Sequence, residues 1–277
     1  MKNTVLPLLL VGFAFLPAAG TLHAQQVTMK DGQVYDSSTL RRSGQSIFVK
    51  VTSAGGLSAV EMGLPVSRIA KISFPEPPEL TQAMEAATKG KIQEVLSLTG
   101  PYVAAQGDYK DLPGSWWPRM ASLRIQALAG TGKYAEAAAL AREIGAANTT
   151  GADSICKGGT LFGSLPSGES EAIILGAKGL PRIGGDNGSA LAQLALGQAL
   201  LLKMDYLGAL RSFLTVIVFY PSSSLLLPAA LQGAADSYMG LKDQQRALQA
   251  FDEISSDWPD SPQAAEAKKK AASLKGH

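Results

Sequence analysis

Two matching stretches in the last third of the chain decide the fold. Residues 206–223 read YLGALRSFLTVIVFYPSS, and residues 244–261 read QQRALQAFDEISSDWPDS. An alanine, a leucine, a phenylalanine, an aromatic-proline pair and a serine recur in the same order, each 38 residues after its first occurrence. A fixed period of this length is typical of proteins built from stacked supersecondary units.

The residue types that recur predict closely packed helices. Ala209 and Ala247 are small enough for two helices to approach each other, and Phe213 and Phe251 follow one turn later on the same face. Each phenylalanine is expected to bury a large apolar area between neighbouring units. The aromatic-proline pairs end the helices, because proline lacks the backbone N–H that a continuing helix needs. We therefore expect two stacked helical hairpins.

Residues 1–24 predict a secretory signal peptide. Lys2 supplies a positive charge, residues 5–16 are apolar and uncharged, and Ala24 is small enough for a cleavage site. The alternative is an uncleaved anchor, but the run is short for a membrane span, which needs about 20 residues. No cysteine stands at the cleavage site, so we do not expect a lipoprotein. We expect a periplasmic or secreted protein without stable membrane insertion after signal cleavage.

Residues 25–75 predict a small β-barrel of the SH3-like or Sm-like kind. Turn signals such as Asp31-Gly32 separate short stretches, and residues 47–51 alternate with the period of two expected of a strand. About five strands in roughly 50 residues fit such a barrel. Basic residues and exposed aromatic residues are few in this part, so we expect no nucleic-acid binding.

The proline-rich segment 75–78 predicts a domain boundary, and residues 79–274 predict an all-α repeat domain. Three repeat units are expected within it: a weaker one at 116–147 and clear ones at 189–223 and 227–261. Residues 148–170 are rich in Gly, Ser and Thr and predict a long loop. Gly100-Pro101 predicts a break or a bend in the helix expected over residues 91–105.

Several residues in order resemble the tetratricopeptide repeat pattern: Leu196-Gly197, Ala209, Phe213 and Pro221. The second unit departs from the pattern by having Ala234-Ala235 in place of Leu-Gly. The aromatic-proline endings resemble periplasmic members of this superfamily, which include an outer-membrane assembly lipoprotein and a cell-division coordinator of the Tol-Pal system. The resemblance implies an all-α, tetratricopeptide-like helical solenoid after the β-barrel, with an envelope protein or peptide segment as its partner.

In this repeat family the first helix of each unit lines the concave face. Carried over by repeat position, the resemblance implies a partner-binding groove lined by polar side chains: Arg119, Ser122 and Gln126, then Gln198, then Gln232 and Asp236. The alternative is a solvated face without a ligand. Trp116 and Trp117 are either packing residues or a surface that binds a partner or stacks on a sugar.

Residue usage argues against catalysis. The two histidines are His23, within the predicted signal peptide, and His277 at the end, so the folded body has none to serve as a general base or a zinc ligand. Cys156 is the single cysteine, so no disulfide can form within the chain. We expect no catalytic residue, no metal site and no cofactor.

Two short motifs match enzymes only in part. Residues 130–133 (Gly-Thr-Gly-Lys) resemble a phosphate loop, but Ala127 and Tyr134 replace its first glycine and its Ser/Thr, so we expect a turn between helices. Ser154 and Lys157 have the Ser-x-x-Lys spacing of penicillin-recognising enzymes without their other motifs. The leading hypothesis is therefore a non-catalytic exported scaffold or adaptor in the bacterial cell envelope. The alternatives are a peptidoglycan- or glycan-binding module and a hydrolase.

Overall fold

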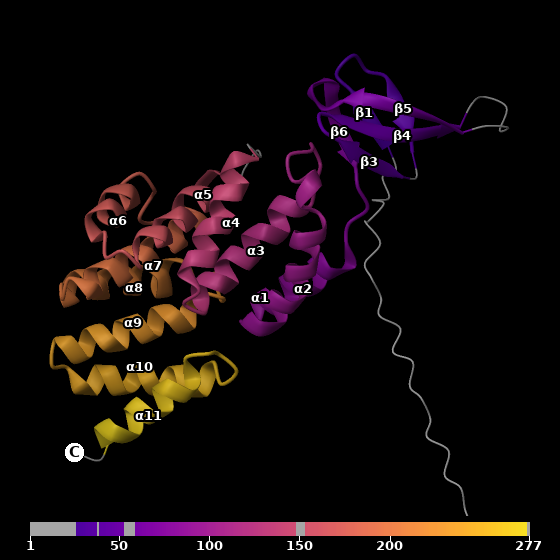
Figure 1. The fold of residues 1–277 in the computed structure, drawn as a ribbon. Coiled ribbons are helices and arrows are strands. Elements are labelled where there is room, and N and C mark those ends of the chain that lie inside the picture. The colour runs from indigo at the N-terminus through magenta and orange to yellow at the C-terminus, as the bar shows by residue number, and fades with distance from the viewer. Residues whose placement is uncertain (1–25, 38, 53–58, 148–152, 276–277) are drawn as a thin grey trace, which may run out of the picture.

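A computed structural model describes residues 26–37, 39–52, 59–147 and 153–275. This part of the chain is mostly helical, with a small antiparallel sheet region at its N-terminal end (Figure 1). The predicted signal peptide, residues 1–24, lies outside the described residues.

The N-terminal part holds two antiparallel sheets of three short strands each. In one sheet β1 (Gln26–Met29) lies between β2 (Val34–Asp36) and β6 (Ile69–Ser73); in the other β4 (Ser46–Thr52) lies between β3 (Leu40–Ser43) and β5 (Ala59–Pro65). The prediction of a closed barrel is therefore wrong for the described strands. The physical reason is the strand pairing: β1 pairs with β2 and β6, and β4 pairs with β3 and β5, so the described strands of the two sheets share a core without a continuous ladder.

Helices fill the rest of the described chain. They are α1 (Pro78–Thr88), α2 (Ile92–Ala105), α3 (Trp117–Gly130), α4 (Tyr134–Ala146), α5 (Asp153–Thr160), α6 (Ser170–Ala177), α7 (Asn187–Leu202), α8 (Tyr206–Phe219), α9 (Leu227–Gly240), α10 (Gln244–Asp257) and α11 (Ala264–Lys275). Short 3₁₀ turns also occur, of which η3 (Leu161–Ser164) extends α5. From α7 to α11, each helix packs against the next one along the chain (Figure 1).

One turn conformation recurs between paired helices. Its first residue has a positive φ of 59° to 78°, and this residue is Gly90, Gly132, Gly168, Met204 or Lys242. The next residue has φ between −92° and −74° and ψ between 58° and 75°. In all five turns this second residue donates its N–H to the carbonyl five positions earlier. The same turn therefore closes five hairpins: α1–α2, α3–α4, η3–α6, α7–α8 and α9–α10.

The recurring phenylalanines lie where the repeat requires. Phe213 and Phe251 are both fully buried. A Cβ added to Gly197 in α7 would lie 2.6 Å from the ring of Phe213, and one added to Gly233 in α9 would lie 2.3 Å from it. Glycine on both neighbouring helices thus makes room for the ring, which packs between α7 and α9.

Residues 153–164 are helical, which corrects the prediction of a loop over 148–170; residues 148–152 lie outside the described part. The glycines of this segment serve a helix crossing. A Cβ on Gly158 would lie 2.0 Å from the carbonyl oxygen of Gly188, so α5 and α7 cross with their backbones in contact. The predicted break at Gly100-Pro101 is also absent, because α2 continues through Pro101.

The connection between α2 and α3 joins the helices to the sheets. Tyr109 and Leu112 from this connection are buried in the core of the sheets. Ile72 of β6 donates its backbone N–H to the carbonyl of Pro113 at 2.9 Å, so this connection also covers the outer edge of β6. The connection between α2 and α3 therefore belongs to the core of the sheets, which is separate from the apolar clusters of the helices.

Contacts also join turns that are far apart in the sequence. The side-chain amide of Gln263, before α11, donates to the carbonyl of Gly130 at the end of α3 at 2.7 Å. The ring of Trp258 lies against Gly90, where an added Cβ would approach it to 2.1 Å. The segment between α10 and α11 therefore reaches back to the first two hairpins.

Candidate functional site

Three of the residues predicted for the groove occupy equivalent places. Gln126, Gln198 and Asp236 stand at the same distance before the positive-φ residue of their hairpin turns, in α3, α7 and α9. Relative to the hairpin turns, the three residues therefore occupy the same repeat position. The surroundings of the three side chains nevertheless differ.

The polar side chains of α3 are largely engaged within the helix itself. Gln126 is only 4% exposed, and its side-chain amide donates to the carbonyl of Ser122 at 3.2 Å. The hydroxyl of Ser122 donates to the carbonyl of Pro118 at 2.7 Å. Arg119 is exposed and contacts the sulfur of Met84 at 3.3 Å. Of the three predicted residues in α3, Arg119 has the most accessible side chain.

The C-terminal helix contacts one of the predicted residues of α9. Lys270 of α11 donates to Asp236 at 2.7 Å and also pairs with Glu266 at 2.9 Å. The side-chain oxygen of Gln232 is buried and accepts no hydrogen bond from any described residue. The carboxylate of Asp236 is thus already neutralised by the chain's own C-terminal helix.

The two tryptophans make contacts inside the chain. Trp117 is fully buried, and its indole N–H donates to the carbonyl of Val103 at 2.9 Å. Trp116 is partly buried, and its indole N–H donates to the carbonyl of Phe74 at the end of the sheet region, at 3.3 Å. Trp117 therefore has no exposed face for a sugar or a partner, and Trp116 fastens the helices to the sheet region.

Gln198 lies at a pocket. The pocket has a volume of about 250 Å³ and is lined by Tyr134, Leu165, Pro166, Gln198 and Leu202. Gln198 is the only amide side chain in this lining; the other lining residues are mainly apolar. Burial raises the pKa of Tyr134 to about 12, so its phenol is neutral near pH 7. The pocket suits an apolar side chain whose neighbouring peptide groups hydrogen-bond to the carboxamide of Gln198.

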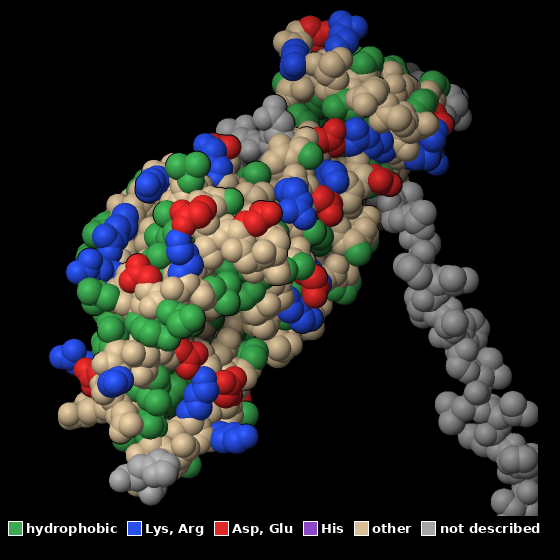
Figure 2. All heavy atoms as spheres, turned by 60° about the vertical axis from the view of Figure 1, so that its left-hand side comes forward, with side chains coloured by type: hydrophobic (Ala, Val, Ile, Leu, Met, Phe, Trp, Pro, Cys, Tyr) green, Lys and Arg blue, Asp and Glu red, His purple; other side chains and the backbone are tan. Residues whose placement is uncertain are grey.

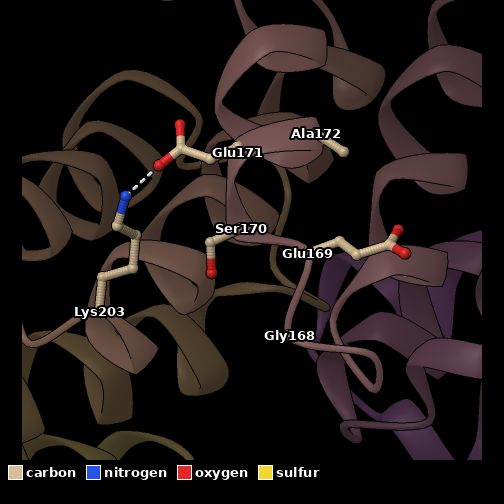
Figure 3. Close-up of a pocket in the computed structure, with 6 residues that line it drawn as sticks. All are labelled: Gly168, Glu169, Ser170, Glu171, Ala172 and Lys203. Carbon is tan, nitrogen blue, oxygen red and sulfur yellow. Dashed lines mark hydrogen bonds and ion pairs between the residues drawn. The ribbon is translucent and has the colours of Figure 1, made fainter.

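A second, larger pocket of about 470 Å³ lies at the start of α6. Figure 3 shows its lining, residues 168–172 and Lys203. Lys203 pairs with Glu171, and this hydrogen bond lowers the pKa of the carboxylate, whereas Glu169 points away from Lys203 (Figure 3). Ser170 is buried and donates to the carbonyl of Ala199 at 3.3 Å. Leu202 of the first pocket and Lys203 of the second are consecutive, so both pockets involve the end of α7.

Two hairpin turns carry exposed apolar side chains that the sequence did not lead us to expect. They are Leu202 (60% exposed), Met204 (71%) and Leu207 (49%) at the α7–α8 turn, and Met239 (37%) and Leu241 (42%) at the α9–α10 turn. We call these five residues the turn patch. Figure 2, which brings this side of the molecule forward, shows hydrophobic side chains at the surface here. The sequence could have indicated this surface, because bulky apolar residues stand in and beside turns, where polar residues are usual.

The residues of the Ser-x-x-Lys motif each pair with another side chain. The hydroxyl of Ser154 donates to Asp186, while Lys157 pairs with Asp153 at 2.6 Å, so the Ser-x-x-Lys residues do not contact each other as a nucleophile and its base. Burial is the largest of the causes that raise the pKa of the Cys156 thiol above its usual range, which disfavours the reactive thiolate. Within the described ranges, no group of three or more His, Cys, Asp or Glu side chains could hold a metal ion.

No helix in the described part of the chain is long and apolar enough to cross a membrane. Comparison of the sequence with models of known protein families and with curated proteins finds no match.

Proposed function

We propose that the protein is a non-catalytic scaffold of the bacterial cell envelope, in which tetratricopeptide-like hairpins form a helical solenoid that binds a segment of another protein. The observation that carries this proposal is the hairpin turn that occurs five times with the same backbone conformation, at intervals close to the 38-residue period. Repeated hairpins of this kind give extended surfaces for binding. The predicted signal peptide supports an exported location.

The binding surface in this proposal includes the pocket beside Gln198. Its carboxamide is partly exposed, and no described residue forms a hydrogen bond with it. A carboxamide both donates and accepts, so it can pair with the N–H and the C=O of a bound peptide. Asp236 already pairs with Lys270 of α11, and the side-chain oxygen of Gln232 is buried.

Site-specific cross-linking in the bacterium that encodes the protein tests this function. A photo-reactive amino acid placed at Gln198 is expected to cross-link one envelope protein, which mass spectrometry of the adduct identifies. The same amino acid at Gln249, an exposed position of α10, is the matched control and is expected to give no such adduct. Adducts of equal yield at both positions, or glycan without protein at position 198, would contradict the scaffold proposal.

A further inference from the structure

We propose that the outer edge of β5 binds an extended segment of a partner protein, which pairs with β5 as a further strand of the β3–β4–β5 sheet. This surface goes beyond the proposed function, which places binding on the helices, because it lies in the sheet region. The free backbone groups of β5, the cover over the other sheet edges and the exposed apolar side chains of β5 support it.

The register of the sheet shows which backbone groups of β5 are free. Val66 donates its N–H to the carbonyl of Gln45 at 2.9 Å, which continues the β4–β5 register by one pair. Hydrogen-bonded and non-hydrogen-bonded pairs alternate in an antiparallel ladder, so Met62 bonds to β4, whereas Glu61 and Gly63 direct their N–H and C=O groups outward. No described residue forms a backbone hydrogen bond with this outer edge. Another extended backbone matches the spacing of these free groups.

The outer edges of the other strands are covered or short. The carbonyl of Leu40 in β3 accepts the phenol O–H of Tyr109 at 3.4 Å, and the carbonyl of Pro113 accepts the N–H of Ile72 in β6 at 2.9 Å. The connection between α2 and α3 therefore meets both of these strands, and β2 has only three residues. Proteins protect their strand edges in these ways because free edges pair with other strands. Among the described strands, the seven-residue β5 is the long edge that has no such cover.

The residues of β5 also leave its edge open. Lysine and proline commonly block an edge, but β5 contains no lysine, and its single proline is its last residue, Pro65. Its one charged residue is Glu61, whose carboxylate pairs with Arg41 of β3 at 3.0 Å. Arg41 lies over the ring of Phe48 in β4, 4.5 Å from the ring centre. The charge of Glu61 is therefore held across the face of the sheet, where it does not obstruct an incoming strand.

Exposed apolar side chains beside this edge define the chemistry of the partner. Val60 is 56% exposed and Met62 is 36% exposed, although both lie on the same face of the strand as the buried Leu64. Leu64 belongs to the core of the sheets, so this is the inner face. A strand added beyond β5 would place every second side chain beside Val60 and Met62. We therefore expect a partner segment with apolar residues at alternate positions, because cross-strand neighbours on one face contact each other.

Cross-linking of the full chain in the bacterium that encodes it tests this surface. A photo-reactive amino acid is placed at Val60, and mass spectrometry identifies the cross-linked segment of the partner. The experiment is repeated with Glu61→Pro, which removes an outward N–H, and with Glu61→Ala, the matched control that keeps it. Proline is tolerated where the N–H of an edge strand faces outward, so Glu61→Pro is expected to fold. We expect the adduct yield to fall about tenfold in Glu61→Pro and to stay within about twofold in Glu61→Ala.

A synthetic peptide with the sequence of the cross-linked segment gives a second measurement, which needs no variant of the chain. Its backbone nitrogens are methylated one at a time, and each peptide is titrated against the wild-type chain by fluorescence anisotropy. Every second N–H of an added strand faces β5, so methylation there removes a hydrogen bond. We expect the Kd to rise about tenfold or more at alternate positions and to change little at the positions between them.

Equal adduct yields in Glu61→Pro and Glu61→Ala would overturn the inference. An adduct between two copies of this chain, or no adduct at position 60, would overturn it as well. Methylation that weakens binding equally at successive positions, or at none, would show that the segment does not pair as a strand. The scaffold proposal is tested separately by the cross-link at position 198: an adduct there without one at position 60 would leave that proposal standing and remove the surface on β5 alone.

Discussion

Met204 and Lys242 place a side chain where three equivalent turns have glycine. The positive φ of this position is imposed by the turn, because the following N–H must reach the carbonyl five residues earlier. Glycine adopts this conformation without steric cost, whereas other residues bring Cβ close to the following carbonyl. All five turns therefore need the same backbone conformation at this position, although only three of them have glycine there.

Substitutions at this position should change stability in opposite directions. We expect Lys242→Gly to raise the free energy of unfolding by about 0.5 kcal/mol, since relief of the left-handed cost exceeds the entropy cost of glycine. Gly132→Ala should lower it by about 1 kcal/mol, and no atom within 4 Å would clash with the new Cβ. Urea titration at constant m-value measures both. Leu241→Gly is the control and should destabilise, because Leu241 has φ −82°.

Arg42 and Asp111 form a partly buried ion pair that should make stability depend on pH. The hydrogen bond from Arg42 is the main cause that lowers the pKa of Asp111 below its usual value of 3.8. A carboxyl whose pKa is depressed by folding stabilises the folded state above its unfolded pKa, and this contribution disappears as pH falls through the folded pKa. We expect Asp111→Asn to cost about 1 kcal/mol at pH 7, a value discounted for the partial exposure of the pair.

Thermal unfolding at pH 7 and in steps down to about pH 2 measures this effect. The difference in Tm between the wild type and Asp111→Asn should shrink below about pH 4. Asp31→Asn is the control, because the exposed pair of Asp31 with Arg68 spans 3.8 Å and contributes little. A difference in Tm that stays constant down to the lowest pH would contradict the assignment.

At the scale of the element, the period of the sequence predicted the hairpins of the C-terminal half well. Phe213 and Phe251 are buried as expected, and α8 to α10 lie within the predicted repeats. The helix α5 was missed because Gly158 and Gly159 have low helix propensity, which a sequence window counts against a helix. Their value for close backbone contact with α7 exists only in the folded chain.

The packing of Phe213 between glycines makes a strong prediction for this element. Gly233→Ala would place a Cβ 2.3 Å from the ring, so we expect a loss of roughly 2 kcal/mol in the free energy of unfolding. Phe213→Leu in the same chain should recover part of that loss, which a double-mutant cycle reveals. Gly107→Ala, with open space around its Cβ, is the control and should be near neutral. Additive effects of the two substitutions would show that the ring and Gly233 are not in contact.

The site was predictable only in part, for a physical reason. Gln126, Gln198 and Asp236 each lie six residues before the positive-φ residue of their hairpin turn. Their exposure depends on what packs over them, and a distant segment supplies this cover, such as Lys270 on Asp236. The strand pattern likewise indicated inward-facing residues, but the alternation of side chains does not say which strand pairs with which.

At the scale of the whole molecule, the sheet region depends on a segment more than 30 residues beyond its last strand. Leu112 is buried in the core of the sheets, so Leu112→Ser should destabilise them by roughly 2 kcal/mol. Hydrogen exchange should then accelerate at β1 and β6, while α7 to α10 keep their protection. Equal acceleration in both regions would mean that the molecule unfolds as one cooperative unit. Leu207→Ser, at an exposed position, is the control and should change neither.

The hydrogen bond from Gln263 to Gly130 and the contact of Trp258 with Gly90 have a mechanical consequence. A row of helical hairpins in which each contacts only its neighbours extends gradually under a pulling force. These two contacts join the segment between α10 and α11 to the first two hairpins, so the distance between the two ends of the helical part is held fixed. Under a pulling force, the helical part should therefore stay stiff until these two contacts break and then extend in a single step.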